Sequence, residues 1–229
     1  MNRKLIFLLP LLTFFSLLAQ ADDTPAVSPT AIYTDSEGEM QETTSIDDGE
    51  APLDVTFRAN PTDMGSHVPA YEWHFRKEGA DNDFMVRYEE NTDYRFVESG
   101  SFTITLKVTL DGTVELDSTT ITVVISESKL EFPNAFSPNG DGINDVFRAK
   151  EGYRSIVEFH AYIFNRWGQK LFDWTDPADG WDGTFKGKDV KDGVYFLQVK
   201  ARGADGRNYN IRRDINLLRG YIEGTTPSE

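Results

Sequence analysis

The side chains best suited to chemistry are gathered in one short segment, Asn139-Gly140-Asp141-Gly142-Ile143-Asn144-Asp145. Asn139, Asp141, Asn144 and Asp145 are candidate calcium ligands, because hard cations prefer several oxygen atoms at once. The helix-loop-helix calcium template fits poorly, since Ile143 is at its fifth position, Asn144 replaces its glycine and Lys150 replaces its bidentate glutamate. Asn, Asp and Gly also form tight turns unaided. The composition therefore favours a structural turn over a calcium site.

Few residues suit catalysis. The three histidines, His67, His74 and His160, are scattered, and no serine-hydrolase, zinc-protease or phosphate-loop motif occurs. Neighbouring carboxylates such as Glu89 and Glu90 point to opposite sides of an extended chain, so they do not flank one bond. We predict no catalytic residue, no resident cofactor apart from the calcium alternative, and a protein that is not an enzyme.

Charge and cysteine content narrow the function further. Removal of a predicted 21-residue leader leaves 21 basic and 38 acidic residues, a formal charge of −17. Such a charge repels nucleic acids and anionic membranes, so neither is an expected partner. No cysteine is present, which excludes disulfides and thiolate metal sites and leaves stability to hydrophobic cores.

The first 21 residues are typical of a Sec signal peptide. Arg3 and Lys4 precede an apolar run from Leu5 to Leu18, and Ala19-Gln20-Ala21 supplies the small-x-small cleavage pattern. The run is shorter than the roughly 20 residues that span a bilayer, and no cysteine lies nearby for lipid attachment. We expect cleavage after Ala21 and a mature chain that does not span the membrane.

Alternating apolar residues predict an immunoglobulin-like β-sandwich over residues 51–126. Residues 22–50 are rich in acidic and small polar residues and are predicted to be mostly a flexible acidic lead-in, with Ile32 and Tyr33 as candidates for a first strand. Period-two runs begin at Leu53, Tyr71, Phe84 and Phe102, and the last turns at Asp111-Gly112 into a further strand.

This module resembles the PKD domains of surface and secreted proteins. The resemblance lies in Gly49–Phe57, in Tyr71-Glu72-Trp73-His74-Phe75 at the aromatic motif, and in Tyr94–Leu106. The sequence departs from that family at Arg76–Gly79, where a Gly-Asp-Gly is usual. The resemblance implies a spacer or adhesion module.

A second β-sandwich is predicted over residues 130–220, followed by a flexible tail at 221–229. Alternation from Val157 to Ile163 is followed by a turn at Asn165–Gly168, and two later alternating runs flank Asp205-Gly206. We expect Trp181 to fill the core. The aromatic residues Tyr162, Phe164, Trp167 and Trp174 are likewise expected in the core, with sugar stacking as the alternative.

The second module resembles the gliding-motility-associated C-terminal domain, the type B sorting domain of type IX secretion. The signature segments, in order, are Phe132–Phe147, Ile163–Phe172, Gly180-Trp181-Asp182-Gly183 and Asp192–Phe196. The resemblance implies Sec export, then recognition by the type IX machinery together with an outer-membrane β-barrel partner, and delivery to the cell surface or the medium. The residues we expect in the sorting interface are Arg166, Trp167, Gly168, Arg212, Arg213 and Arg219.

Three functions remain to be compared. The first is a small adhesion protein whose N-terminal module contacts a protein or glycan ligand through loops such as Gly79–Asp83. The second is a structural or docking subunit of the secretion or gliding apparatus. The third, a glycan-active enzyme, would need two carboxylates in one cleft, and the sequence suggests no such pair.

Overall fold

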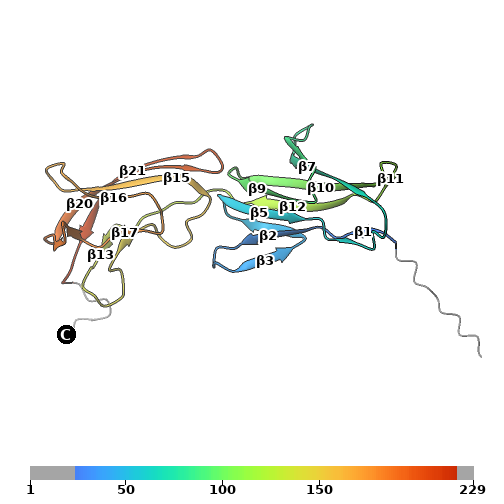
Figure 1. The fold of residues 1–229 in the computed structure, drawn as a ribbon. Helices are drawn as coiled ribbons and strands as arrows, with labels where there is room; N and C mark the ends of the chain where they lie inside the picture. The colour runs from blue at the N-terminus through green and yellow to red at the C-terminus, as the bar shows by residue number, and fades with distance from the viewer. Residues whose placement is uncertain (1–23, 221–229) are drawn as a thin grey trace, which may run out of the picture.

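The chain folds into two β modules that lie end to end (Figure 1). The computed structural model describes residues 24–220, and in this range every regular element is a strand. The predicted class, two tandem β-sandwich modules, is confirmed. The predicted signal peptide at 1–21 and tail at 221–229 lie outside the described residues. No helix long and apolar enough to cross a membrane occurs between residues 24 and 220.

Two facing sheets form the N-terminal module. The smaller sheet has the spatial order β3 (Met40–Thr43), β2 (Thr30–Thr34), β5 (Leu53–Arg58) and β9 (Asn91–Phe96). The larger has the order β4 (Ser45–Gly49), β12 (Thr119–Ile125), β10 (Gly100–Leu110), β7 (Pro69–Lys77) and β8 (Met85–Arg87), with β11 (Val114–Glu115) also paired to β10. A separate two-stranded sheet is formed by β1 (Ala26–Val27) and β6 (Pro61–Thr62), which pair antiparallel.

Aromatic rings fill the space between these sheets. Along β5 and β7 buried and exposed residues alternate, which places Phe57, Trp73 and Phe75 in the core. The Phe57 ring lies 5.5 Å from that of Phe75, edge to face, and 5.9 Å from that of Trp73. The Trp73 indole N–H donates to the Glu89 carbonyl at 3.1 Å, so its one polar atom is satisfied.

The prediction of a flexible lead-in at 22–50 is wrong. Strands β2, β3 and β4 all lie within it, and β2 contains Ile32 and Tyr33. The polar composition of this segment suggests disorder because β2 and β4 each bury only one apolar side chain, Ala31 from β2 and Ile46 from β4. Backbone pairing holds the rest, since β2 pairs with β5 and β4 runs parallel to β12. The N-terminal module therefore begins before residue 51.

One long sheet dominates the C-terminal module. Its spatial order is β13 (Ala135–Phe136), β21 (Asn208–Leu217), β20 (Gly193–Gly203), β15 (Ile156–Phe164) and β16 (Lys170–Trp174). The short pairs that cover one face are β14 (Phe147–Arg148) with β17 (Gly180–Trp181), and β18 (Thr184–Phe185) with β19 (Lys188–Asp189).

Trp181 lies at the centre of the second core, as predicted. It is fully buried, its ring packs edge to face on Tyr195 at 5.1 Å, and its indole N–H donates to the Thr184 carbonyl at 2.8 Å. Trp174 is also buried, as expected, whereas the prediction that Trp167 is a core residue is wrong, because 75% of its surface is exposed. The β15–β16 turn carries Trp167 beyond the end of the sheet.

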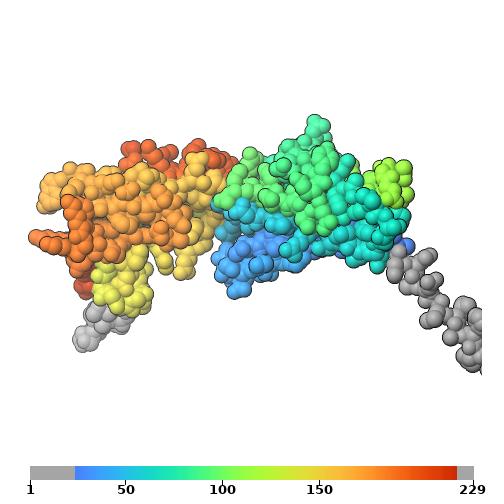
Figure 2. Space-filling model, viewed as in Figure 1, coloured from blue at the N-terminus to red at the C-terminus, as the bar shows by residue number. Residues whose placement is uncertain are grey.

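The two modules are bonded to each other directly. The Ala51 N–H donates to the Ser155 hydroxyl at 3.2 Å, and the Ser99 N–H donates to the Ala204 carbonyl at 3.0 Å. Ala204 belongs to the β20–β21 hairpin, yet its methyl group is buried in the core of the N-terminal module. In the connecting segment Ser128 is buried and donates to Asp205 at 2.7 Å. The modules meet at a waist near the middle of the molecule (Figure 2), and these contacts make them one unit.

This junction predicts that Ala204→Glu weakens the whole molecule. A carboxylate in this buried, unpaired position should lower the free energy of unfolding by about 2–4 kcal/mol. Ala178→Glu, at an exposed position of the same module, is the matched control and should stay within about 0.5 kcal/mol. Urea denaturation followed by tryptophan fluorescence measures both. Equal midpoints for the two variants would show that the junction contacts do not stabilise the chain.

Candidate functional site

The loop predicted to hold calcium is closed by its own hydrogen bonds. Asp145 accepts from three backbone amides, those of Asn139 at 2.9 Å, Gly140 at 2.7 Å and Gly142 at 2.8 Å. The Asp141 carboxylate accepts from the Ile143 N–H at 2.8 Å. These donors hold the pKa of Asp145 below its usual value of 3.8, with Gly140 contributing most. The carboxylates therefore already stabilise the turn.

Metal binding by this loop stays a prediction. Within residues 24–220, no three histidine, cysteine, aspartate or glutamate side chains are grouped so that they could hold a metal ion. A calcium ion would have to compete with the amide donors for the oxygens of Asp145, with Asn139, Asp141 and Asn144 as the remaining ligands.

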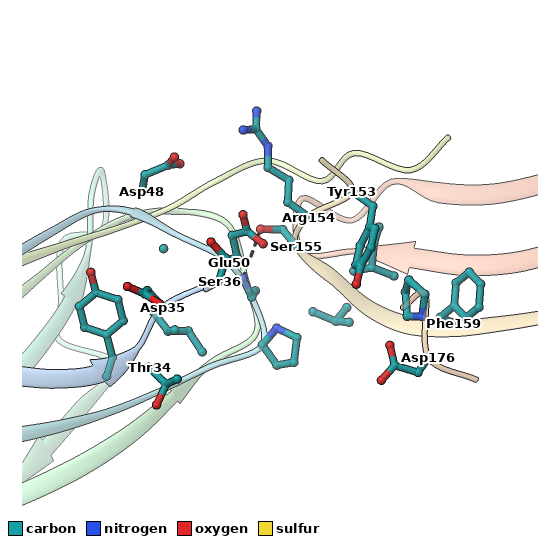
Figure 3. A pocket seen from close by; sticks show the side chains of 18 of the residues that line it. Thr34, Asp35, Ser36, Asp48, Glu50, Tyr153, Arg154, Ser155, Phe159 and Asp176 are labelled. Atoms are coloured by element: carbon teal, nitrogen blue, oxygen red, sulfur yellow. Dashed lines mark hydrogen bonds between the residues drawn. The ribbon is translucent and has the colours of Figure 1, made fainter. Parts of the chain in front are cut away.

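A hollow of about 460 Å³ lies at the junction of the modules (Figure 3). The carboxylates that line it are contributed by Asp35, Asp48 and Glu50 from the N-terminal module and Asp176 from the C-terminal module. Figure 3 shows Glu50 at the boundary, while the Arg154 guanidinium extends away from it. The sequence suggests no carboxylates sharing a cleft, because these four lie in three segments, at Asp35, at Asp48 and Glu50, and at Asp176, that only the fold brings together.

Among these carboxyl groups, Glu50 has a raised pKa. Among the described residues its side chain has no hydrogen bond and no ion pair. Burial raises its pKa above the usual 4.5, the nearby Asp48 raises it further, and Arg154 opposes the rise. The hollow thus holds a carboxyl group whose charge is disfavoured.

A second site lies at the opposite end of the C-terminal sheet, in the turn between β15 and β16. The Asn165 side-chain oxygen accepts from the N–H groups of Trp167 and Gln169, both at 3.0 Å. Gly168 has φ +77°, a conformation that suits glycine. This rigid turn holds the Arg166 guanidinium 4.3 Å from the centre of the exposed Trp167 ring.

Beside this turn the outer face of the sheet is hollowed. We call this concavity, of about 640 Å³, the arginine hollow; its lining residues are Phe164, Asn165, Arg166, Gly168, Phe196, Leu197, Gln198, Arg212, Arg213 and Asp214. Phe164 pairs across the strands with Phe196, and Gln198 pairs with Arg212. Phe196 also lines the adjoining concavity beside Trp167.

The structure separates the six predicted sorting residues into two groups. Arg166, Gly168 and Arg212 lie around the arginine hollow, with Trp167 just beyond it. Arg213 also lines it but donates to the Phe132 carbonyl at 3.1 Å. Arg219 is engaged elsewhere, because its guanidinium donates to the carbonyls of Val190 and Gly183. Sequence reasoning missed Phe196 and Gln198, although their out-of-phase positions in an alternating strand were visible.

The loop predicted to contact a ligand, Gly79–Asp83, is anchored at its end. The Asp83 carboxylate accepts from the Arg76 Nε at 2.8 Å and lies 2.8 Å from the His74 Nδ1. The other ring nitrogen of His74, Nε2, lies 3.2 Å from the Glu72 carboxylate, and the His74 side chain is only 18% exposed. His74 and Arg76 hold the pKa of Asp83 below 3.8, the His74 hydrogen bond being the largest cause.

Charge is distributed very unequally between the modules. Residues 24–129 contain 7 basic and 21 acidic residues, a net formal charge of −14, whereas residues 130–220 contain 14 basic and 13 acidic residues, a net charge of +1. The arginine hollow therefore lies on the module that carries almost none of the net negative charge.

The C-terminal module has a recognisable family. Residues 130–213 match the CHU_C type IX secretion signal domain. The sequence resemblance to a type IX sorting domain is thereby confirmed for this module. A type IX sorting signal implies export to the cell surface or the extracellular space and contact with the secretion machinery. No curated protein sequence matches the chain.

Solved structures give only distant likenesses. The chicken CNTN1 FN1–FN3 domains are 9% identical, with 81% of this chain and 73% of that chain covered and a TM-score of 0.30. The tetra-tandem repeat in the extending region of a large adhesion protein is 10% identical, with 86% and 68% covered and a TM-score of 0.28. The fibronectin(III)-like modules of Clostridium thermocellum CbhA are 13% identical, with 80% and 95% covered and a TM-score of 0.23. The fold class rests on the strand pairing itself.

The loop at 139–145 predicts a pH-dependent effect of Asp145→Asn. Because the folded pKa of Asp145 is lowered, its stabilisation is present above the unfolded value near 3.8 and is lost as the pH falls through the folded pKa. The variant should melt a few degrees below the wild type at pH 7, and the difference should disappear in strong acid. Calorimetry at several pH values measures this. If calcium instead raises the wild-type melting temperature and the variant does not respond, the loop is a calcium site.

For Glu50→Gln in the junction hollow, we predict a change in melting temperature at pH 7 of the opposite sign. The raised pKa means that stability is complete below about 4.5 and is lost as the pH rises through the folded pKa. Removal of the charge should therefore raise the melting temperature slightly at pH 7 and leave it unchanged near pH 4. Glu37→Gln, at an exposed position, controls for net charge. A lower melting temperature for Glu50→Gln at pH 7 would contradict the assignment.

Proposed function

We propose that this chain is a small non-catalytic protein that leaves the cell by Sec export and then by type IX secretion. Its C-terminal module is the sorting domain, and its N-terminal module, which we take to be PKD-like, binds a protein or glycan ligand at the cell surface or in the medium. The observation that carries the proposal is the family match at residues 130–213. An outer-membrane β-barrel is the partner we expect during sorting.

The N-terminal module, which is the passenger that the sorting domain would carry, supports a binding role. The N-terminal module is one immunoglobulin-like sandwich whose core is filled by apolar and aromatic side chains. Its exposed loops offer positions for ligand contact, and its charge of −14 favours a ligand with basic groups. The anchored loop Gly79–Asp83 is the first place where we would seek that contact.

One observation favours a second candidate, a docking or structural subunit of the secretion or gliding apparatus. The single passenger module is bonded directly to the sorting module, so the chain forms one short rigid piece. Co-purification with an outer-membrane barrel at fixed stoichiometry would favour this subunit. Loss of ligand binding with export intact, after changes in Gly79–Asp83, would favour the binding protein.

Cell fractionation tests the export pathway. The full chain is expressed in a bacterium with and without a working type IX system, and the mature protein is followed by mass spectrometry. We expect a chain that begins at Asp22, reaches the surface or medium in the intact strain, and accumulates in the periplasm when the system is broken. Surface delivery in both strains would contradict the proposal.

A further inference from the structure

The arginine hollow combines three properties. It is concave, it is bordered by exposed apolar side chains, and it carries arginines without carboxylate partners. Phe196 is 43% exposed, although its strand is paired on both sides, and Val194, which lines the adjoining concavity together with Phe196, is 49% exposed. Exposed large apolar side chains grouped in this way indicate a surface that another molecule covers.

The arginines make the chemistry of that molecule specific. Neither Arg166 nor Arg212 forms an ion pair within residues 24–220, and Asp214 is the only carboxylate among the lining residues. Arginine and aromatic residues are enriched where protein interfaces concentrate their binding energy. A complementary surface would place carboxylates opposite the two guanidinium groups and an apolar side chain between them.

A glycan fits this surface less well than a protein does. The rings of His160, Tyr162 and Phe164 stack on one another along β15, with centroids 4.2 and 6.2 Å apart. Their faces are therefore turned toward each other along the strand, whereas a sugar ring needs an open aromatic face. Arg166 covers one face of the Trp167 ring as well.

Long-range charge disfavours two other occupants. The chain carries a formal charge of −15, which opposes approach to an anionic membrane and to a second copy of the same chain. A separate protein can present its acidic groups to the nearly neutral C-terminal module alone.

We propose that the arginine hollow is the surface by which a protein of the export machinery binds the folded sorting domain. The bound segment presents carboxylates to Arg166 and Arg212 and inserts an apolar side chain beside Phe196. Asn165 acts as a positioning residue, because its side chain fixes the turn that carries Arg166. This inference rests on the proposed function and names the contact through which that function operates.

Charge reversal in the full-length protein tests the proposal. In the strain with a working type IX system, Arg166→Glu with Arg212→Glu should reduce the exported fraction about tenfold or more and leave folded protein in the periplasm. Arg148→Glu with Lys188→Glu makes the same change in net charge at exposed positions outside the hollow and should be exported normally. Arg166→Lys with Arg212→Lys should retain most of the export, because it keeps both charges.

Phe196→Ser tests the apolar part without emptying the core, since this side chain is exposed. It should also reduce export, and thermal melting of each purified variant confirms that it is folded. Wild-type export that does not require the type IX system overturns the proposed function and the docking surface with it. Export of the double glutamate variant at the wild-type level, in a strain where export does require the system, overturns the docking surface alone.

Two measurements on purified protein exclude the other occupants. Sedimentation should show a monomer, and flotation with vesicles containing phosphatidylglycerol should show no binding. Self-association or vesicle binding that Arg166→Glu with Arg212→Glu abolishes would overturn the proposal and assign the hollow to a second copy or to a membrane surface.

Discussion

The alternation of buried and exposed side chains along two long central strands holds this molecule together, because a chain without cysteine has no covalent bridge in either module. In the N-terminal module the strand is β10, with partners β7 and β12; in the C-terminal module it is β20, with partners β15 and β21. A slip of one residue in either strand would exchange its two faces. The same register that buries Leu197 therefore leaves Phe196 exposed on the outer face.

The sequence predicted best the strands that alternate over several residues. β5, β7, β10 and β15 were expected from their period-two runs and occur where expected. β3 and β4 were missed because their residues are mostly polar, and the parallel pairing of β4 with β12 brings together segments that are distant in the chain. The run that begins at Phe84 was predicted as a longer strand, but only Met85–Arg87 pairs with β7.

For the site, residue type was predictable and surroundings were not. Arg166 and Arg212 are predictable as interface residues because they are basic residues in or after recognisable motifs, and the sheet brings them to one hollow. Their neighbours Phe196 and Gln198 come from a third strand, and only the cross-strand register shows that they are adjacent. Arg219 illustrates the converse, since a charged residue near a chain end looks accessible in a sequence but here bonds to two backbone carbonyls.

The direct bonding between the modules also has a mechanical meaning. Only a few residues connect the last strand of the first module to the second, and Ser128 among them is buried. Hydrogen bonds on both sides of the connection oppose bending there. The two modules therefore keep a fixed relative orientation, and a force on the N-terminal module is transmitted to the C-terminal module as a torque. A partner that holds the C-terminal module thus also sets the direction of the N-terminal module.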